Sequence, residues 1–135
     1  MLTAIFAVLA GFALSAQPAR PRITVYKTAT CGCCTKWVDH MRAGGFDITA
    51  QNVDDIAAVK KRLGVPPELG SCHTSVVDGY VVEGHVPADS IKRLLRERPK
   101  FAGLAVPGMP FGSPGMEMEG KRDPYSVVSF DRFGR

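Results

Sequence analysis

The stretch RITVYKTATCGCCTKWVDHMRA, residues 22–43, decides the fold, because a strand pattern passes into a helix pattern within a few residues. Arg22 to Thr28 is rich in β-branched and aromatic residues and predicts a strand. From Cys33 to Ala43 apolar residues recur at helical spacing, and we expect two of them, Trp37 and Met41, to pack in the core. The stretch therefore predicts a strand that runs through a cysteine-rich turn into a helix.

The segments that follow continue this alternation. Their patterns predict a strand, a helix, a pair of antiparallel strands and a last helix over residues 46–53, 54–64, 71–86 and 87–99. Asp78-Gly79 lies inside the third of these segments and is the strongest short hairpin signal. The resulting order, β-α-β-α-β-β-α, predicts an α/β protein with a thioredoxin-like sandwich.

The composition changes after Pro99. Residues 101–124 are dense in Gly, Pro and Met, and we expect no regular element there. A loop of this length in a compact domain is usually functional or disordered. Alternation returns over residues 125–133 and predicts an edge strand, which would hold the Gly/Pro/Met-rich loop across the domain.

The chain begins with a segment that differs from the rest. Residues 1–16 contain no charged side chain and join an apolar stretch to small residues, which predicts a signal peptide or, if it is not cleaved, a membrane anchor. A Pro/Arg tether over residues 17–22 then leads into a single domain over residues 23–135. Export to an oxidising compartment would make free thiols there notable.

Charge gives little indication of a macromolecular partner. The formal net charge is +4, and the Lys and Arg residues are spread along the 135-residue chain without a basic run interleaved with aromatics. Nucleic-acid binding normally requires such a patch, so we expect no nucleic-acid partner. At this length the domain can bury a core without disulfides as its main support, which indicates that its four cysteines serve chemistry.

Three cysteines crowd the turn before the first helix. Cys31 and Cys34 have the C-x-x-C spacing of a thiol redox pair, in which one sulfur attacks and the other resolves the mixed disulfide. A helix N-terminus stabilises thiolates, which serve disulfide exchange and metal binding equally. Cys33 exceeds what a redox pair needs. Three neighbouring thiolates repel each other unless protonated, oxidised or bound to a cation, and Cu(I) is a fitting soft cation.

A second set of donors follows in the hairpin. If the fold is thioredoxin-like, His73 stands where such proteins carry a cis-proline facing the redox pair, so Cys72-His73 would place a thiol and an imidazole beside the cluster. His85, at the end of the hairpin, approaches the same end of the sheet as a ligand or as a partner of one. His40 follows Cys33 by seven residues along the helix, and we expect a structural role for it.

The methionines of the C-terminal loop add soft sulfur. Met109, Met116 and Met118 lie where helical or strand periodicity cannot explain them, and the case for copper binding is weaker for Met118 than for the other two. Thioethers bind Cu(I) and ignore hard cations, so these residues favour copper over zinc. The alternative is that the methionines fill gaps or anchor the loop.

The chain resembles the CopG-like family of exported proteins linked to bacterial copper resistance. The resemblance rests on KTATCGCCTKWVDHMRAGGFDI, LGSCHTSVVDGYVVEGHVPADSIKRLL, GLAVPGMPFGSPGMEM and YSVVSFD, which together cover most of the chain after residue 22. It implies a thioredoxin-like fold and copper ligation by the C-x-C-C cysteines, Cys31, Cys33 and Cys34. It also implies a role in interconverting Cu(I) and Cu(II).

Three functions are consistent with these residues. The first is a periplasmic copper-binding protein of copper resistance that holds one or several copper ions and exchanges them with other copper-handling proteins. Its expected metal ligands are Cys31, Cys33, Cys34, Cys72, His73, His85, Met109 and Met116, with Cys31 and Cys34 as a redox pair. The second is a thiol-disulfide oxidoreductase, and the third is a closed structural zinc site, which would leave the methionines without a role.

Overall fold

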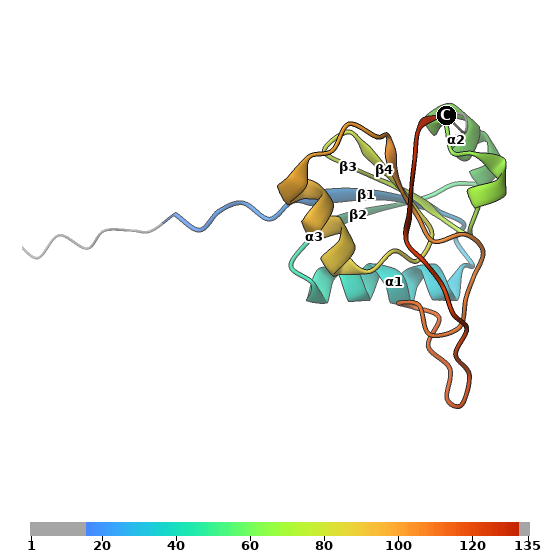
Figure 1. The fold of residues 1–135 in the computed structure, drawn as a ribbon. Coiled ribbons are helices and arrows are strands. Elements are labelled where there is room, and N and C mark those ends of the chain that lie inside the picture. The colour runs from blue at the N-terminus through green and yellow to red at the C-terminus, as the bar shows by residue number, and fades with distance from the viewer. Residues whose placement is uncertain (1–15, 133–135) are drawn as a thin grey trace, which may run out of the picture.

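The structure is a computed structural model that describes residues 16–132. The predicted signal peptide therefore lies, apart from Ala16, outside the described residues. The described chain forms one six-stranded sheet with helices on it (Figure 1). Its elements in chain order are β1 (Arg22–Lys27), α1 (Gly32–Ala43), β2 (Asp47–Asn52), α2 (Ile56–Leu63), the 3-10 helix η1 (Pro67–Leu69), β3 (Thr74–Val77), β4 (Tyr80–Glu83), α3 (Ala88–Glu97), β5 (Gly103–Ala105) and β6 (Val128–Phe130).

The sheet has the strand order β2-β1-β3-β4-β5-β6. β1 pairs with β2 in parallel and with β3 antiparallel. The β3–β4 hairpin turns at Asp78-Gly79, where both residues have positive φ angles of 47° and 82°. Two-residue hairpin turns of this kind need positive φ at both positions, which explains why Asp-Gly predicted the turn correctly. The prediction of an α/β protein is confirmed.

Local sequence signals set the helix ends close to their expected positions. Asp55 caps α2 by accepting the backbone N–H of Ala58 at 2.9 Å, and Gly64 ends that helix with a φ of 74°. α1 begins at Gly32, one residue before the expected start, with Cys31 as its N-cap. Within the described residues, no helix is both long and apolar enough to cross a membrane.

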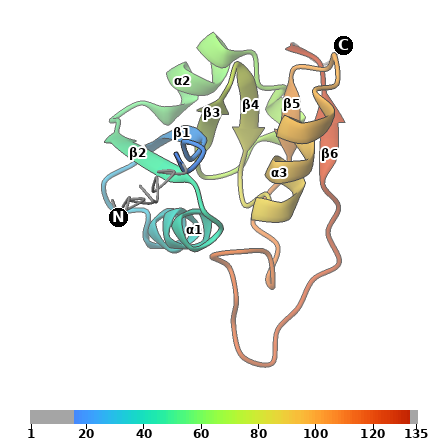
Figure 2. The same ribbon diagram turned by 90° about the vertical axis from the view of Figure 1, so that its left-hand side faces the viewer.

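Helices cover both faces of the sheet (Figure 2). Val82 of β4 packs in the larger core cluster with side chains of α1 and α3, including the fully buried Trp37 and Ile91. Its neighbour Val81 points to the opposite face and packs in the second cluster, where Leu63 at the end of α2 joins it. Alternating side chains of one strand thus serve two cores, so α1 and α3 lie on one face and α2 on the other.

The expectation that residues 101–124 hold no regular element is wrong for Gly103–Ala105, which forms β5. This short strand pairs in parallel with β4 and antiparallel with β6, so its partners supply the order that its composition does not. A Cβ at Gly103 would lie 2.0 Å from the carbonyl oxygen of Val81, so glycine permits the close approach of the two strands. The predicted edge strand is confirmed as β6.

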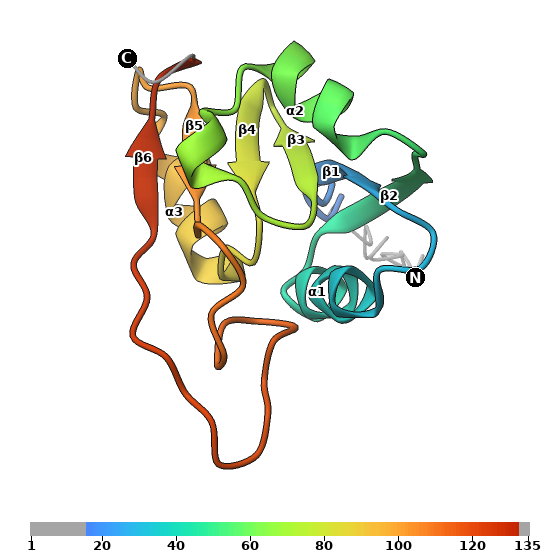
Figure 3. The ribbon, with the colours of Figure 1, turned by 90° about the vertical axis from the view of Figure 1, so that its right-hand side faces the viewer.

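The loop from β5 to β6 leaves the sheet, comes close to the start of α1 and projects beyond that helix before it returns (Figure 3). It is ordered by its own contacts: Asp123 accepts the backbone N–H of Phe111 at 2.9 Å, and Met118 and Lys121 form an isolated antiparallel bridge. The loop reaches the first turn of α1, where a Cβ at Gly115 would lie 2.8 Å from the carbonyl oxygen of Cys33. It therefore closes against the cysteine-rich turn.

Candidate metal site

The cysteine-rich turn is held by the packing of α1. Trp37 and Met41 are fully buried, as predicted, and the Trp37 indole donates to the carbonyl oxygen of Val86 at 2.9 Å. This packing fixes the rotation of the helix, so Cys34 in its first turn faces the core while Cys33 is only half-buried. The turn thereby buries Cys34 and leaves Cys31 and Cys33 half-buried at the edge of the core.

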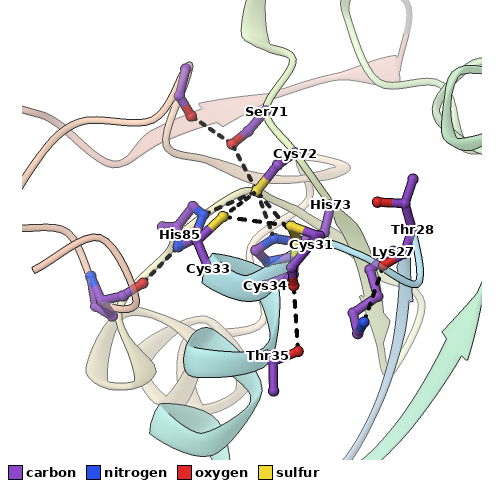
Figure 4. The surroundings of a disulfide bond; sticks show 12 residues. Lys27, Thr28, Cys31, Cys33, Cys34, Thr35, Ser71, Cys72, His73 and His85 are labelled. Atoms are coloured by element: carbon purple, nitrogen blue, oxygen red, sulfur yellow. Dashed lines mark hydrogen bonds between the residues drawn. A yellow bond between two sulfur atoms is a disulfide. The ribbon is translucent and has the colours of Figure 1, made fainter.

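Cys31 and Cys34 form a disulfide, with their Cα atoms 5.3 Å apart. Cys33 is a free thiol, and its Sγ lies 3.5 Å from the Sγ of Cys31 (Figure 4). The C-x-x-C pair is thus oxidised while the sulfur between its members stays available. Of the three cysteines in the motif, Cys33 is therefore the one that can bind a metal without prior reduction, because thiolate is the ligating form.

Cys72 brings a fourth sulfur to this turn from the segment before β3. Its Sγ lies 3.4 Å from the Sγ of Cys34 and 3.8 Å from the Sγ of Cys33. The four sulfur atoms of Cys31, Cys33, Cys34 and Cys72 all lie within 4.8 Å of one another. Residues far apart in the chain therefore build one sulfur cluster.

Cys72 also belongs to a second group of donors. Its Sγ lies 3.3 Å from Nδ1 of His73 and 3.0 Å from Nε2 of His85, and both imidazoles are fully buried. The two rings stand edge to face with their centroids 5.0 Å apart. The predicted residues His73 and His85 thus meet at Cys72, which is the one donor shared by both groups.

The hydrogen bond of His85 to the loop determines its tautomer. Nδ1 donates to the carbonyl oxygen of Pro114 at 2.7 Å, since a carbonyl oxygen can only accept. Burial lowers the pKa of His85, so the ring is neutral and Nε2 carries a lone pair directed at Cys72. Metal-binding histidines in proteins are typically oriented by such a hydrogen bond, which comes from the ring nitrogen that does not bind the metal.

The pKa values of the other two members of this group, Cys72 and His73, are also shifted in the direction that favours the neutral side chain. Burial, followed by the charges of His85 and Lys60, lowers the pKa of His73 well below its usual value. Burial and the neighbouring Cys33 raise the pKa of the Cys72 thiol to about 12. Two neutral imidazoles and a neutral thiol therefore meet in the metal-free protein, and a cation would replace the thiol proton.

The loop contributes backbone groups that the sequence did not identify. The hydroxyl of Ser71 donates to the carbonyl oxygen of Gly108 at 2.5 Å, and the N–H of Gly108 donates to the carbonyl oxygen of Gly70 at 3.1 Å. Together with Pro114 and Gly115 these residues seat the loop on the site. Only their glycine and proline content signals such a role, because backbone contacts leave no side-chain pattern.

The predicted methionine ligands flank these contacts. Met109 follows Gly108 and Met116 follows Gly115, so both lie next to residues that contact the site, with Met109 43% exposed. Their role as ligands stays a prediction. His40 has the structural role expected of it, because its Nε2 accepts the backbone N–H of Ala88 in the first turn of α3 at 3.2 Å.

The donor set fits a soft metal ion. Thiolates and imidazoles suit copper and zinc, and thioethers in the adjoining loop suit Cu(I) alone. A closed zinc site takes four ligands in a tetrahedron, whereas three other sulfurs and two imidazole nitrogens lie near the Cys72 sulfur. All four sulfurs are donors once the disulfide is reduced. This number of soft donors could hold more than one ion through bridging sulfur.

Comparison with known proteins agrees with this chemistry. A family described as a protein of unknown function, DUF411, matches residues 69–116, the part that carries Cys72, His73, His85 and the first part of the loop. Two solved structures of a copper resistance protein, CopG, are similar to the chain: form 2 at 52% identity with a TM-score of 0.82, and form 1 at 53% identity with a TM-score of 0.80. The matches cover 87% of this chain and 94% and 93% of those chains. No curated protein matches the chain.

The fold and the site define an α/β protein with a cysteine-histidine cluster that could bind a metal ion. The chain belongs to the CopG-like family of copper resistance proteins, as its sequence indicated. A copper-related function follows from this membership and from the cluster.

Proposed function

We propose that the protein binds Cu(I) through the cysteine cluster and interconverts Cu(I) and Cu(II) as part of copper resistance. The observation that carries the proposal is the convergence of four sulfurs and two imidazoles on Cys72. The first ligands are the sulfurs of Cys33 and Cys72 and the imidazoles of His73 and His85. The thioethers of Met109 and Met116 complete the set.

The thiol pair of Cys31 and Cys34, when its disulfide is reduced, supplies the electrons of the redox step. Reduced Cys31 and Cys34 can each lose a proton and one electron as the S–S bond forms, and the two electrons reduce two Cu(II) ions to two Cu(I) ions. The reverse reaction breaks the disulfide and returns two thiols. Because Cys33 and Cys72 stay free in the disulfide form, they hold copper close to the reacting pair throughout.

We also infer that the domain is thioredoxin-like and acts in the periplasm, where it exchanges copper with other copper-handling proteins. The strand order β2-β1-β3-β4, with parallel β1 and β2 and a β3–β4 hairpin, supports the first part. The apolar segment at residues 1–16 supports export. Action in that oxidising compartment would explain a site that functions with one disulfide formed.

A competition titration tests the copper site. Reduced protein is titrated with Cu(I) against a chromophoric chelator, next to a Cys33→Ser/Met109→Leu variant. We expect the variant to bind at least about 10-fold more weakly, because even partners that only orient a ligand contribute 10–100-fold. Met118→Leu is the matched control, since Met118 lies in the same loop and is 50% exposed. Equal affinity of the variant and the wild type would count against the proposal.

A second candidate is a thiol-disulfide oxidoreductase, which the Cys31–Cys34 disulfide at the start of α1 favours. In that case turnover in an insulin-reduction assay survives Cys33→Ser and is lost in Cys31→Ser. The copper proposal expects no appreciable insulin reduction by either variant or by the wild type. The insulin-reduction assay on the wild type, Cys33→Ser and Cys31→Ser therefore separates the two functions.

A further inference from the structure

Glu83 is a fully buried carboxylate that is not one of the metal donors. It is the last residue of β4, two residues before His85, and it faces Thr74 across the β3–β4 hairpin. A buried charge is costly unless it is paired and hydrogen-bonded. The partners of this carboxylate therefore indicate what it holds in place.

Both oxygens of the Glu83 carboxylate have partners. Oε1 accepts the backbone N–H of Ser71 at 2.8 Å and forms an ion pair with the Lys60 ammonium. Oε2 accepts the hydroxyl of Thr74 at 2.6 Å, and Lys60 Nζ donates to the Oγ1 of Thr74 at 2.9 Å. One side chain thus joins α2, β3 and β4 to the irregular segment that precedes β3.

The two residues bound to the carboxylate oxygens stand on either side of the Cys72-His73 pair. Ser71 comes directly before the pair and Thr74 directly after it. Residues 70–73 belong to no helix or strand, and single backbone hydrogen bonds tie the two ends of this segment to its neighbours: the carbonyl oxygen of His73 accepts from Gly84 at 3.0 Å and that of Gly70 from Gly108 at 3.1 Å. The position of Cys72 and His73 therefore depends on how this segment is held at its two ends.

We propose that Glu83, anchored by Lys60, is a positioning residue of the copper site that holds Cys72 and His73 against the cysteine-rich turn. The inference rests on the proposed copper function. Cys72 Sγ lies between 3.0 Å and 3.8 Å from four other donor atoms. Donors must converge within about 0.5 Å of the productive geometry, so loosening this segment separates the two donor groups.

The test compares Glu83→Gln with Glu97→Gln, a matched change at an exposed ion pair with Arg93. Two quantities are measured: the affinity for Cu(I) against a chromophoric chelator, and the rate at which iodoacetamide alkylates Cys72 in the reduced, metal-free protein. We expect Glu83→Gln to bind Cu(I) about 10–100-fold more weakly and to be alkylated faster, because the uncharged side chain no longer forms the ion pair with Lys60 that holds the segment of Cys72. Glu97→Gln should match the wild type in both.

A second variant separates positioning from folding. Lys60→Met/Glu83→Met removes both charges of the buried pair at similar volume, a replacement that proteins often accept without loss of stability. We expect its melting temperature to lie near that of the wild type while its Cu(I) binding stays weak and Cys72 stays reactive. This variant answers the question if Glu83→Gln does not fold. Wild-type affinity and wild-type alkylation in the folded double variant would overturn the inference.

The two readouts also distinguish this inference from the proposed function. If the wild type binds no Cu(I), the copper proposal fails, and faster alkylation of Cys72 in the double variant still shows that Glu83 positions that residue. If the wild type binds Cu(I) and the double variant binds it equally well, the copper proposal stands and the role of Glu83 is refuted.

Discussion

The two donor groups of the metal site are built in different ways. Cys31, Cys33 and Cys34 lie within four residues of the chain, and the start of α1 places all three. His73 lies before β3 and His85 after β4, and they meet through the strand pairing of the hairpin and the contact of His85 with the loop. The first group is a product of local sequence and the second of tertiary structure.

Different interactions support the two groups. The helix group, which consists of Cys31, Cys33 and Cys34 together with Cys72, is held in place by Trp37. This side chain belongs to the same helix and is fully buried against the sheet. The hairpin group, which consists of Cys72, His73 and His85, depends on residues elsewhere in the chain. Glu83 holds the segment of Cys72, and Pro114 in the loop orients His85. We therefore expect substitutions at a distance to damage the hairpin group and leave the helix group intact.

The largest effect is expected from Cys72→Ser, because Cys72 is the only donor common to both groups. The substitution removes a sulfur from the four-sulfur cluster and from the pair of histidines at once. Partners that merely orient a ligand are worth 10–100-fold in affinity, so loss of this shared ligand should weaken Cu(I) binding by more than about 100-fold. Chelator competition measures the change.

Cys33→Ser is the comparison for that experiment. Cys33 Sγ lies 3.5 Å from the sulfur of Cys31 and 3.8 Å from that of Cys72, and Cys33 is not part of the hairpin group, so its loss leaves that group complete. We expect a smaller loss of affinity than for Cys72→Ser. The reverse order would show that the helix group alone holds the metal and that the histidines do not.

A smaller effect is expected from Gly115→Ala, which acts on the hairpin group through the loop. A Cβ there would meet the carbonyl oxygen of Cys33 at 2.8 Å and Nδ1 of His85 at 3.1 Å, at a φ of +89°. The loop must shift, and the hydrogen bond from His85 to Pro114 weakens with it. We expect roughly 10-fold weaker Cu(I) binding, because this bond orients a ligand.

Gly120→Ala is the control for Gly115→Ala, because it introduces the same kind of backbone strain without the contact to Cys33 and His85. Gly120 lies in the same loop with a φ of +71°, but a Cβ there would have no atom within 4 Å. Both variants pay a similar conformational cost of about 1 kcal/mol, and only Gly115→Ala disturbs the site. Equal copper affinities in the two variants would show that the loop does not support the hairpin group.

The same contrast explains what the sequence could predict. The strand, the cysteine-rich turn and the helix of residues 22–43 follow from local patterns, and so does the hairpin at Asp78-Gly79. The convergence of Cys72, His73 and His85 could be expected from the motifs, since the hairpin places both of its ends at the same end of the sheet. These predictions use periodicity and turn chemistry, which act over a few residues.

Interactions between distant segments were not visible in the sequence. β5 has three residues and no strand pattern, and it forms because β4 and β6 pair with it. Glu83 reads as an ordinary polar residue at the end of a strand, since nothing local shows that Lys60 and Ser71 will reach it. The backbone carbonyl of Pro114 carries no side-chain signal at all. Tertiary contacts determine these features.

The smallest effect concerns pH and again distinguishes the two groups. In the metal-free protein with its disulfide intact, Cys31 and Cys34 do not titrate, whereas His73 is buried and its pKa is lowered well below 6.5. Below about pH 6.5 the unfolded chain binds a proton at this histidine that the folded protein does not bind. Stability is therefore full above that pH and falls as the pH drops, by at most about 1.4 kcal/mol per pH unit for this one group.

Urea unfolding of the chelator-treated protein at pH 7, 6 and 5 measures this fall. His73→Gln removes the titrating ring, so its unfolding free energy should be lower at pH 7 and should change less between pH 7 and pH 5 than that of the wild type. Parallel pH profiles for the two proteins would mean that His73 is not the group responsible. A flatter profile in the variant would show that the hairpin group holds its imidazoles neutral at a cost in stability, which keeps their lone pairs ready for the metal.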